Sequence, residues 1–532
     1  MNANAAGREA RPLGELIGLL AARGHLRNVR AGPAAGPAQP ATVAAVPVRG
    51  VAYDSRRVGP GTLFVAVPGL HVDGHEYAPG AVAAGASALV VEQPLEALAV
   101  PQLVVKRSQF ALATAAAWWE RWPARELGVI GVTGTDGKTT TTFLVAAILA
   151  SAGLPAGLVG TVEIGIGGRR APNEARTTTP EAPELQGFLR AMVEAGDRFA
   201  VLEATSHGLA LERVGEIAFD VGVLTNLTHE HLEFHGTHEA YRTAKRSLFE
   251  RLAVTAENPD KGWGKQAVLN RDDRWFAEFA AAARDSGARI LTYGADPAAD
   301  VRVSAVEEDA RHLRLGIATA RWRGDVALRL AGRFNVHNAL AAAAVGEALG
   351  LDPGAIRAGL ESVAGVPGRM ERIDLGQPFG VIVDYAHTPD SLEKVLQILA
   401  PVAAAAGGGL IAVFGSAGER DVVKRPLMGR IAGDRARLVV VTDEDPRLED
   451  RQAILEQIAG GARAAGRVDG RDLLVVADRD AAIAAAFERA RPGDVVLLAG
   501  KGHEGSIIYG TEKRPWDDRE AARRALRALG HG

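Results

Sequence analysis

Cysteine is absent from this 532-residue chain, which excludes a disulfide framework and a thiolate zinc site. The chain also lacks an excess of one charge, because it has 61 basic and 64 acidic side chains and a net charge of -3. A broad electrostatic surface for nucleic acid or for an anionic membrane is therefore not expected, although a local basic cleft is compatible with this balance. The lack of cysteine fits the reducing cytoplasm, and we expect neither a nucleic-acid partner nor a membrane partner.

Long uninterrupted apolar runs are lacking as well. Charged residues such as Arg8 and Glu15 break up the apolar N-terminus, whereas a secretory signal carries an unbroken apolar stretch. The longest weakly polar stretch, 143–162, has about the length of a membrane span, but Gly153 and Pro155 stand in its middle. We predict a buried helix followed by a buried strand there, rather than a transmembrane helix.

The composition is that of a globular protein, with 47% hydrophobic and 23% charged residues. We predict α/β domains over 1–110, 111–363 and 364–532, because short apolar strands alternate with helical segments as in parallel sheets. The proline-rich stretch 31–47 is typical of a flexible surface insertion. Strands are expected at 128–132, 199–202, 221–224 and 267–269, and then at 380–383, 410–414, 438–441, 473–476 and 494–499.

The sharpest local signal is a glycine-rich turn between the strand at 128–132 and a helix. Its residues are Gly134, Thr135, Asp136, Gly137, Lys138, Thr139 and Thr140. Glycines let backbone N–H groups turn toward a phosphate, Lys138 can reach the β- and γ-phosphates, and Thr139 can ligate Mg²⁺. Because Val132 stands where the Walker pattern has its first glycine, the loop is a shorter variant; the alternative is a structural turn with a chance lysine.

Two further clusters come after predicted strands. Glu203 follows the strand at 199–202, and a carboxylate at this end of a parallel strand points into the crevice where ligands bind, although such residues more often cap helices. Mg²⁺ on a nucleotide is held by one or two carboxylates. The histidine-rich segment 229–238 lacks the H-E-x-x-H pattern of zinc enzymes, so we place His231 beside Glu203 as a second metal ligand rather than in a zinc site.

Short blocks of sequence occur in a fixed order along the chain: GTDGKTTT, TTTPE, EATSHGL, TNLTHEHLEFHGTHEAYRTAKRSLF, GRFNVHN, PGRMER, DYAHTPDSL, FGSAGERDVVKRP, DEDPRLED and AGKGHE. Each block alone is weak, but together the chain resembles the Mur ligase family, and within it the synthetases that add the third residue of the peptide. The resemblance implies a UDP-sugar-binding N-terminal domain, a central P-loop ATPase domain with a parallel sheet, and a C-terminal domain of dinucleotide-fold-like topology. It also implies an enzyme that uses ATP and Mg²⁺ to join a diamino acid to UDP-MurNAc-L-Ala-D-Glu in peptidoglycan precursor synthesis; we expect a monomer.

The resemblance implies roles for individual residues, carried over motif by motif. The catalytic group is Lys138, Glu203, His231 and Lys245, and Thr139 joins the last three around Mg²⁺. Nucleotide contacts beyond the glycine-rich turn fall on Asn338, Arg369 and Asp384. Contacts to the UDP-sugar peptide fall on Ser55, Thr177, Thr178, Thr205 and Arg213. The chain departs from the family pattern at Asp136, Thr205, Glu230 and Glu233, where Asn, Ser, Asp and Asp are usual, and each change keeps the donor or acceptor type.

Lys245 matches the family lysine that CO₂ converts to a carbamate. An ammonium cannot bind a cation, whereas a carbamate carries a carboxylate-like pair of oxygens, so the modification would make Lys245 a metal ligand. The reaction requires the neutral amine. Without the family resemblance, the simpler interpretation is that Lys245 is a solvated lysine on a helix.

The sequence of the third domain is compatible with two classes of amino-acid substrate. The residues expected to bind it are Arg420, Asp445, Arg447, Gly500 and Glu504. Enzymes for meso-2,6-diaminopimelate carry Asp-Asn-Pro-Arg where this chain has EDPR at 444–447. The two arginines can bind carboxylates and Glu504 can accept from a distal ammonium, which suits diaminopimelate. The charge of Asp445 favours a plain ammonium, as in lysine or ornithine. Because of the arginines we expect diaminopimelate.

Other functions are compatible with parts of this pattern. Another ligase of the superfamily, such as a folylpolyglutamate synthetase or the next Mur enzyme, would share Glu203, His231 and Lys245 but is not expected to carry the DPR and GKGHE blocks. An ATP-gated binding protein on the same scaffold would be expected to have lost Lys138, Glu203 or Lys245. A P-loop hydrolase would not need an amino-acid domain.

Overall fold

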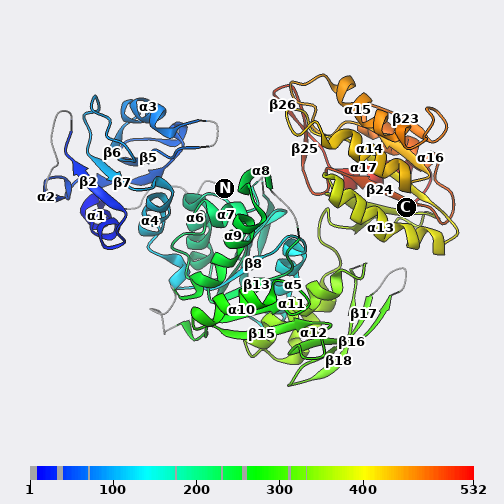
Figure 1. Ribbon diagram of the computed structural model, residues 1–532, viewed down its shortest axis with the longest axis horizontal. Coiled ribbons are helices and arrows are strands. Elements are labelled where there is room, and N and C mark those ends of the chain that lie inside the picture. Colours follow the sequence, from blue (N-terminus) through cyan, green and yellow to red (C-terminus); the bar gives the residue numbers. More distant parts are fainter. Residues whose placement is uncertain are drawn as a thin grey trace. The chain divides into compact units, whose positions relative to one another are not determined.

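The computed structural model describes residues 9–32, 40–69, 72–173, 177–228, 232–253, 261–308, 313–330 and 332–532. Helices alternate with strands and cover three larger sheets in this part of the chain, so the predicted three-domain α/β fold is confirmed (Figure 1). By their contacts, the residues form two compact units. One extends to Ala305 and adds Gly316–Val326 and Val336–Leu360, and the other comprises Val306–Leu315, Ala327–Asn335 and Glu361–Gly532. The boundaries expected near 110 and 363 stay predictions.

The N-terminal domain is built on a sheet of order β2-β7-β6-β5-β4, in which β4 to β7 run parallel and β2 is antiparallel to β7. Leu16 and Leu20 of α1 and Trp118 of α4 share a buried core with Leu63 and Val90 of the strands. The elements are β1 (Arg11–Pro12), α1 (Leu13–Ala22), β2 (Leu26–Arg30), α2 (Pro40–Val43), β3 (Pro47–Val48), β4 (Gly50–Ala52), β5 (Thr62–Val65), α3 (Ala78–Ala83), β6 (Ala86–Val91), β7 (Gln102–Val105) and α4 (Ser108–Trp119).

The stretch 31–47, which the composition predicts to be a flexible surface insertion, contains two short elements. Residues 33–39 lie outside the described part, but α2 follows them, and β3 then pairs with β1. Val43 and Val48 are buried in the same core as α1. Residues 40–47 therefore include regular structure with Val43 buried, which a low-complexity composition does not reveal, and the flexibility of the insertion stays a prediction.

The central sheet has the order β11-β10-β9-β12-β8-β13-β14-β15-β16-β17-β18. Its strands from β9 to β16 in this order run parallel, and β10 and β11 form an antiparallel edge. All residues of β8, β12 and β13 are buried, as expected where helices cover both faces of a parallel sheet. The elements are β8 (Gly128–Thr133), α5 (Lys138–Ser151), β9 (Ala156–Val159), β10 (Glu163–Ile166), β11 (Arg169–Pro172), α6 (Ala182–Glu194), β12 (Phe199–Glu203), α7 (Ser206–Ala210), β13 (Val221–Leu224), α8 (Leu232–His235), α9 (His238–Glu250), β14 (Gln266–Asn270), α10 (Phe276–Asp285), β15 (Arg289–Gly294), β16 (Val301–Glu308), β17 (Leu313–Ala318), β18 (Arg323–Leu328), α11 (Asn335–Ala348) and α12 (Pro353–Ser362).

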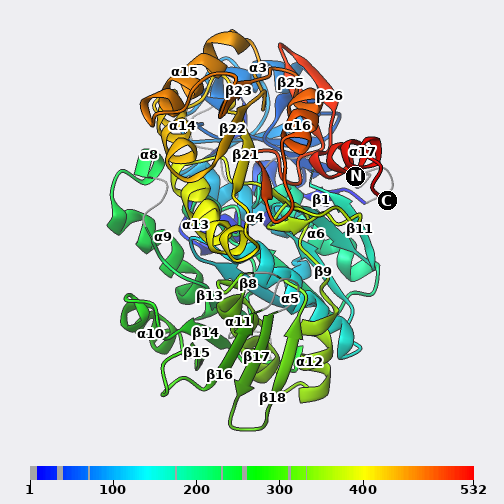
Figure 2. The same cartoon turned by 90° about the vertical axis from the view of Figure 1, so that its right-hand side faces the viewer.

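The C-terminal sheet has the order β19-β20-β24-β21-β22-β23 and is parallel except for β19. Leu396 of α13, Met428 of α14 and Ile458 of α15 pack on one face, and α16 and α17 cover the other (Figure 2). The elements are β19 (Glu371–Arg372), β20 (Gly380–Asp384), α13 (Pro389–Ala405), β21 (Leu410–Phe414), α14 (Lys424–Arg435), β22 (Leu438–Val441), α15 (Arg451–Ala464), β23 (Leu473–Val475), α16 (Arg479–Glu488), β24 (Val495–Ala499), β25 (Ser506–Tyr509), β26 (Glu512–Pro515) and α17 (Asp518–Ala528).

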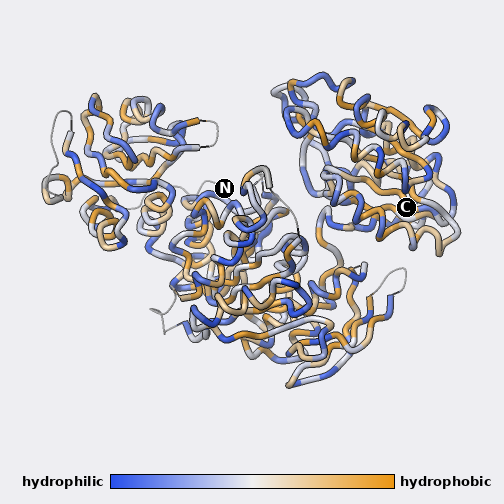
Figure 3. The backbone as a smooth tube through the Cα atoms, in the orientation of Figure 1, coloured by the Kyte–Doolittle hydropathy of each residue, from blue (hydrophilic) through white to orange (hydrophobic). Residues whose placement is uncertain are grey.

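Every strand expected from the apolar runs is found, with bounds that agree within a residue or two, and hydrophobic segments run through the strands of each sheet (Figure 3). The weakly polar stretch 143–162 holds most of α5 and all of β9, as predicted. Among the described residues, no helix combines the length and apolar character needed to cross a membrane.

Candidate active site

The loop between β8 and α5 has a backbone that requires glycine at two positions. Gly134 has a φ of 143° and Gly137 a φ of 82°, which side chains rarely adopt. A Cβ at Gly134 would lie 1.8 Å from Oγ1 of Thr225, and one at Gly137 would lie 2.2 Å from Oδ1 of Asn338. Oγ1 of Thr225 also donates to the carbonyl of Asp136 at 2.7 Å. These contacts shape a loop at the N-terminus of α5, which suits a phosphate.

Both predicted catalytic lysines meet at this loop. Nζ of Lys138 donates to the carbonyl oxygens of Gly134 at 2.9 Å and of Thr135 at 2.8 Å. Lys245 comes from α9, is 1% exposed, and donates to the same Gly134 oxygen at 2.6 Å. Its Nζ lies 4.6 Å from the centre of the Tyr241 ring. Lys245 is therefore not the solvated helix lysine of the simpler interpretation.

Glu203 ends β12, which pairs with β8, and its side chain reaches the loop. The residue is 1% exposed, and its Oε2 accepts from Oγ1 of Thr139 at 3.1 Å and from Oγ1 of Thr161 at 3.0 Å. A carboxylate beside the threonine hydroxyl of a phosphate loop is an oxygen donor set that fits Mg²⁺. His231 lies outside the described residues, so its place beside Glu203 stays a prediction.

The residues predicted for the UDP-sugar peptide surround Thr179. The hydroxyl of Thr179 donates to the carbonyl of Glu203 at 2.8 Å and shares a hydrogen bond of 3.0 Å with Thr205. Its carbonyl accepts from Arg213 at 3.1 Å. The hydroxyl of Thr178 is 2.9 Å from Oγ1 of Thr161, which donates to the Glu203 carboxylate. The structure thus brings Thr178, Thr205 and Arg213 into the neighbourhood of Glu203.

Two other residues of this predicted set lie at its margin. Thr177 is exposed and adjoins Thr178. Ser55 opens a short 3₁₀ turn after β4, and Arg57 at the end of this turn forms an ion pair with Glu184 in the first turn of α6. The hydroxyl of Tyr53 also contacts Glu184, at 3.3 Å. The Ser55 turn is therefore fastened to the central domain near the segment that holds the threonines.

The nucleotide contacts predicted outside the loop fall in both units. Asn338 belongs to α11 and packs on the glycine-rich loop as described. Arg369 and Asp384 belong to the second unit and are neighbours, since Oδ2 of Asp384 accepts from the backbone of Met370 at 2.7 Å. Burial raises the pKa of Asp384, and the Arg369 guanidinium partly offsets this rise.

The residues predicted for the amino acid lie on loops that follow β21, β22 and β24. The backbone N–H of Gly418 donates to the carbonyl of Asp445 at 2.8 Å, which ties the loop of Arg420 to that of Arg447. The N–H of Arg447 donates in turn to the carbonyl of Ile508 in β25 at 3.0 Å. The carboxyl ends of parallel strands form the edge where α/β sheets bind ligands. Arg420, Asp445, Arg447, Gly500 and Glu504 all lie on loops at that edge.

Arg447 has two features of a binding residue. Its φ of 56° is in the left-handed region, which is unusual for a residue other than glycine and is often found at functional sites. Its Nε is buried and has no hydrogen-bond partner within the described ranges. Arg447 does not cap the following helix, because α15 begins at Arg451 with Asp450 as its cap.

Asp445 differs from the sequence-based expectation. It is 4% exposed, and its Oδ1 accepts from Nζ of Lys501 at 3.0 Å and from the backbone of Ile508 at 2.9 Å. Lys501 also pairs with Glu504. The charge of Asp445 is thus compensated within the protein, which removes the argument that it favours lysine or ornithine.

Sequence reasoning missed several side chains that contact the predicted site residues of each unit. The hydroxyl of Tyr241, one helical turn before Lys245, is 2.9 Å from Oγ1 of Thr135 in the loop. The four-residue spacing, which places Tyr241 and Lys245 on one face of a helix, could have indicated Tyr241. Thr161 and Lys501 reach their carboxylate partners from distant segments, and no local pattern signals that contact.

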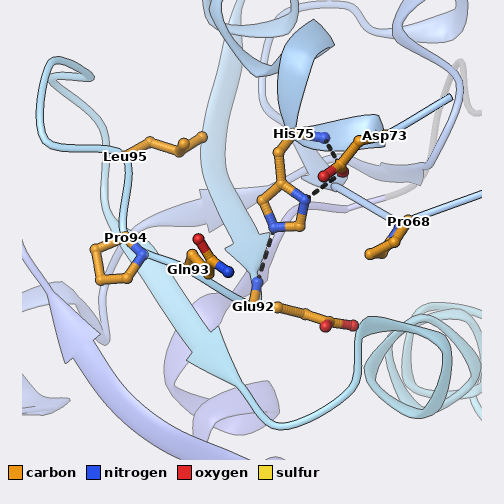
Figure 4. Close-up of a pocket in the computed structure, with 7 residues that line it drawn as sticks. All are labelled: Pro68, Asp73, His75, Glu92, Gln93, Pro94 and Leu95. Atoms are coloured by element: carbon orange, nitrogen blue, oxygen red, sulfur yellow. Dashed lines mark hydrogen bonds and ion pairs between the residues drawn. The ribbon is translucent and has the colours of Figure 1, made fainter.

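A cavity of about 160 Å³ in the N-terminal domain is lined by Pro68, Asp73, His75, Glu92, Gln93, Pro94 and Leu95 (Figure 4). Nδ1 of His75 lies 2.7 Å from Oδ1 of Asp73, and the backbone of Glu92 donates to Nε2 at 2.9 Å. The Glu92 carboxylate accepts from Ser108 at 2.7 Å. These polar groups bind one another, and none of the predicted site residues lines the cavity, so we do not include it in the candidate site.

Comparison with known proteins agrees with this arrangement. The chain matches the Mur ligase family catalytic domain over residues 47–117, the Mur ligase middle domain over 132–346 and the glutamate ligase domain of Mur ligases over 368–502. It is 52% identical over 491 residues to a UDP-N-acetylmuramyl-tripeptide synthetase of Roseiflexus sp. (strain RS-1), covering 91% of this chain and 96% of that protein.

Two further comparisons extend this result. A UDP-N-acetylmuramoyl-L-alanyl-D-glutamate--2,6-diaminopimelate ligase of Geobacter metallireducens is 42% identical over 500 residues, covering 91% of this chain and 95% of the relative. A solved structure of a ligase of the same name superimposes with a TM-score of 0.64 at 32% identity, over 93% of this chain and 97% of the other. The predicted resemblance is confirmed, and the chain belongs to the Mur ligase family of ATP-dependent acid–amino-acid ligases.

Proposed function

We propose that the chain joins meso-2,6-diaminopimelate to UDP-N-acetylmuramoyl-L-alanyl-D-glutamate, while ATP is converted to ADP and phosphate. It would do so with Mg²⁺, as a cytoplasmic monomer, in the synthesis of a peptidoglycan precursor. The names of the relatives support the two substrates, and the glycine-rich loop with Glu203 and two lysines supports the use of ATP. The observation that carries the choice of amino acid is the Nε of Arg447, which is buried and has no partner within the described ranges.

The chemistry requires the chain to bring two anions together. A carboxylate is a poor electrophile, so its oxygen first attacks the γ-phosphorus of ATP, the bond to the ADP oxygen breaks, and an acyl phosphate forms. The amine then attacks the acyl carbon, the C–N bond forms, phosphate leaves and the nitrogen loses a proton. The first step places the negative carboxylate close to the negative phosphates, so positive groups fixed at the phosphates lower the barrier.

The residues at the loop fit these needs. Lys138 is placed on the loop that would surround the phosphates, where its ammonium would offset their charge. Mg²⁺ would be held by Thr139, Glu203, His231 and a carbamate on Lys245, and it would neutralise phosphate charge. The hydroxyls of Thr178 and Thr205 contact Thr161 and Thr179, which in turn donate to Glu203, and from there they could bind the peptide that carries the acceptor carboxylate.

Replacing Arg447 by alanine should separate recognition of the amino acid from recognition of the other substrates. If the guanidinium binds the distal carboxylate of diaminopimelate, its loss leaves that carboxylate desolvated and unpaired, at a cost of about 2–5 kcal/mol. We expect a large rise in the KM for diaminopimelate and little change in the KM values for ATP and the UDP-dipeptide, measured by steady-state kinetics. Arg524→Ala, which removes an exposed arginine of α17, is the matched control. A rise in all three KM values would contradict a specific role for Arg447.

A competition experiment tests the amino acid itself. The enzyme is given UDP-MurNAc-L-Ala-D-Glu, ATP, Mg²⁺ and equimolar meso-diaminopimelate, L-lysine and L-ornithine, and the tripeptide product is identified by its mass. The proposal predicts the diaminopimelate product. Exclusive use of lysine or ornithine would overturn the substrate while leaving a ligase. Product only from a folate and glutamate, in a separate reaction, would favour a folylpolyglutamate synthetase.

A further inference from the structure

Lys501 is a completely buried lysine that joins two loops of the amino-acid site. It follows β24, and its Nζ donates to Oδ1 of Asp445 at 3.0 Å on the loop after β22. The same Nζ pairs with Glu504, three residues further along its own loop. Since β21 lies between β24 and β22 in the sheet, this one ammonium bridges loops from strands that do not touch each other.

A third carboxylate belongs to the same cluster. Glu444 is 7% exposed, and its Oε2 has no hydrogen-bond partner in the part of the chain that the structure describes. Burial raises the pKa of Glu444, and the positive charges of Lys424 and Lys501 work against that rise. The positive charge of Lys501 therefore acts on Glu444, Asp445 and Glu504 together. Without the Lys501 ammonium, these negatively charged carboxylates would lie close together in a buried place.

The backbone beneath the cluster is held by a separate pair. Arg479, which is fully buried, binds Asp518 with two hydrogen bonds of 2.7 Å and also donates to the carbonyls of Asp443 and Ala499. These carbonyls directly precede Glu444 and Gly500. The position of the two loops thus depends on Arg479 as well, so Lys501 is not needed merely to keep the loops in place.

We propose that Lys501 is a specificity-determining positioning residue, which orients Asp445 and Glu504 and cancels enough carboxylate charge for the site to accept a substrate with a distal carboxylate. The inference rests on the proposed function, since it assumes that this edge of the sheet binds the amino acid. This role of Lys501 explains how a chain with an aspartate near Arg447 can still prefer a dicarboxylate. Because Asp445 pairs with Lys501, its negative charge does not repel the distal carboxylate of the substrate.

The test is the selectivity of Lys501→Met, given as the ratio of kcat/KM for meso-diaminopimelate to that for L-lysine. We expect the variant to lower this ratio at least about tenfold, mainly through the KM for diaminopimelate, because the added negative charge repels its distal carboxylate. The KM values for ATP and the UDP-dipeptide should stay the same. Lys513→Met, an exposed lysine of β26, is the matched control and should keep the wild-type ratio.

Second variants distinguish a charge effect from a loss of packing. Asp445→Asn combined with Lys501→Met restores the net charge and should recover most of the ratio, which a packing defect would not. If Lys501→Met does not fold, Asp445→Asn alone should raise the ratio and Lys501→Arg should keep it. An unchanged ratio in folded Lys501→Met, no recovery in the double variant, or no rise with Asp445→Asn would overturn the inference. A wild-type enzyme that forms no product with any diamino acid would overturn the proposed function instead.

Discussion

Lys138→Ala is expected to reduce the rate of ATP-dependent amide formation by ~10²-fold or more, the loss typical of a missing electrostatic group at a reacting centre. Lys138 is the first residue of α5, and its Nζ is held within hydrogen-bond distance of the carbonyls of Gly134 and Thr135, on the loop that we assign to the phosphates. The loss should appear in kcat, measured by product formation at saturating substrates, because the charge acts on the transferring phosphoryl group.

The control for this prediction is an exposed lysine of the same unit. Lys106→Ala removes an equal charge far along the chain from the loop and should leave kcat unchanged. Near-wild-type turnover of Lys138→Ala would show that the glycine-rich turn is structural, with a lysine there by chance.

Lys245→Ala is expected to lose on the order of a hundredfold in kcat and to recover partly when acetate or formate is added. If the lysine carries a carbamate, the mutation removes an anionic metal ligand and leaves a space at the loop that a small carboxylate can enter. The position suits this role, because Lys245 is 1% exposed and its Nζ is 2.6 Å from the Gly134 carbonyl. The measurement is kcat as a function of carboxylate concentration, together with the intact mass of the wild type in bicarbonate.

A second buried lysine provides the control for rescue. Lys261 pairs with Asp220 at 2.8 Å, and Lys261→Ala is not expected to respond to acetate, because its partner is itself a carboxylate. An active Lys245→Ala variant, with a bare amine in the wild-type protein, would contradict the carbamate.

The sequence predicted the sheets well because buried parallel strands are almost entirely apolar. The runs at 221–224, 410–414 and 438–441 have the bounds of β13, β21 and β22. The composition of 40–47, which is mostly alanine and proline, did not indicate that Val43 is buried in the core of the N-terminal domain. Local composition does not show which side chain of such a segment meets a distant core.

In the candidate site, too, the sequence predicted local features and missed contacts between distant segments. Glycine spacing indicated the loop, and the strand before Glu203 indicated its carboxylate, since both signals are local in the chain. The compensation of Asp445 by Lys501 was not predictable, because it depends on β21 lying between the strands that carry them. From the sequence, the charge of Asp445 was expected to act on the substrate. In the structure, Asp445 instead pairs with Lys501, which lies on the loop of another strand.

ADP release in the presence and absence of each substrate distinguishes a ligase from a hydrolase and from a binding protein. We expect rapid release only when ATP, Mg²⁺, UDP-MurNAc-L-Ala-D-Glu and a diamino acid are all present, with one ADP formed for each amide bond. Equal ATP hydrolysis without the UDP-dipeptide and the diamino acid would contradict a ligase and indicate a simple hydrolase. Binding of ATP with no turnover under any of these conditions would indicate a nucleotide-gated binding protein on the same scaffold.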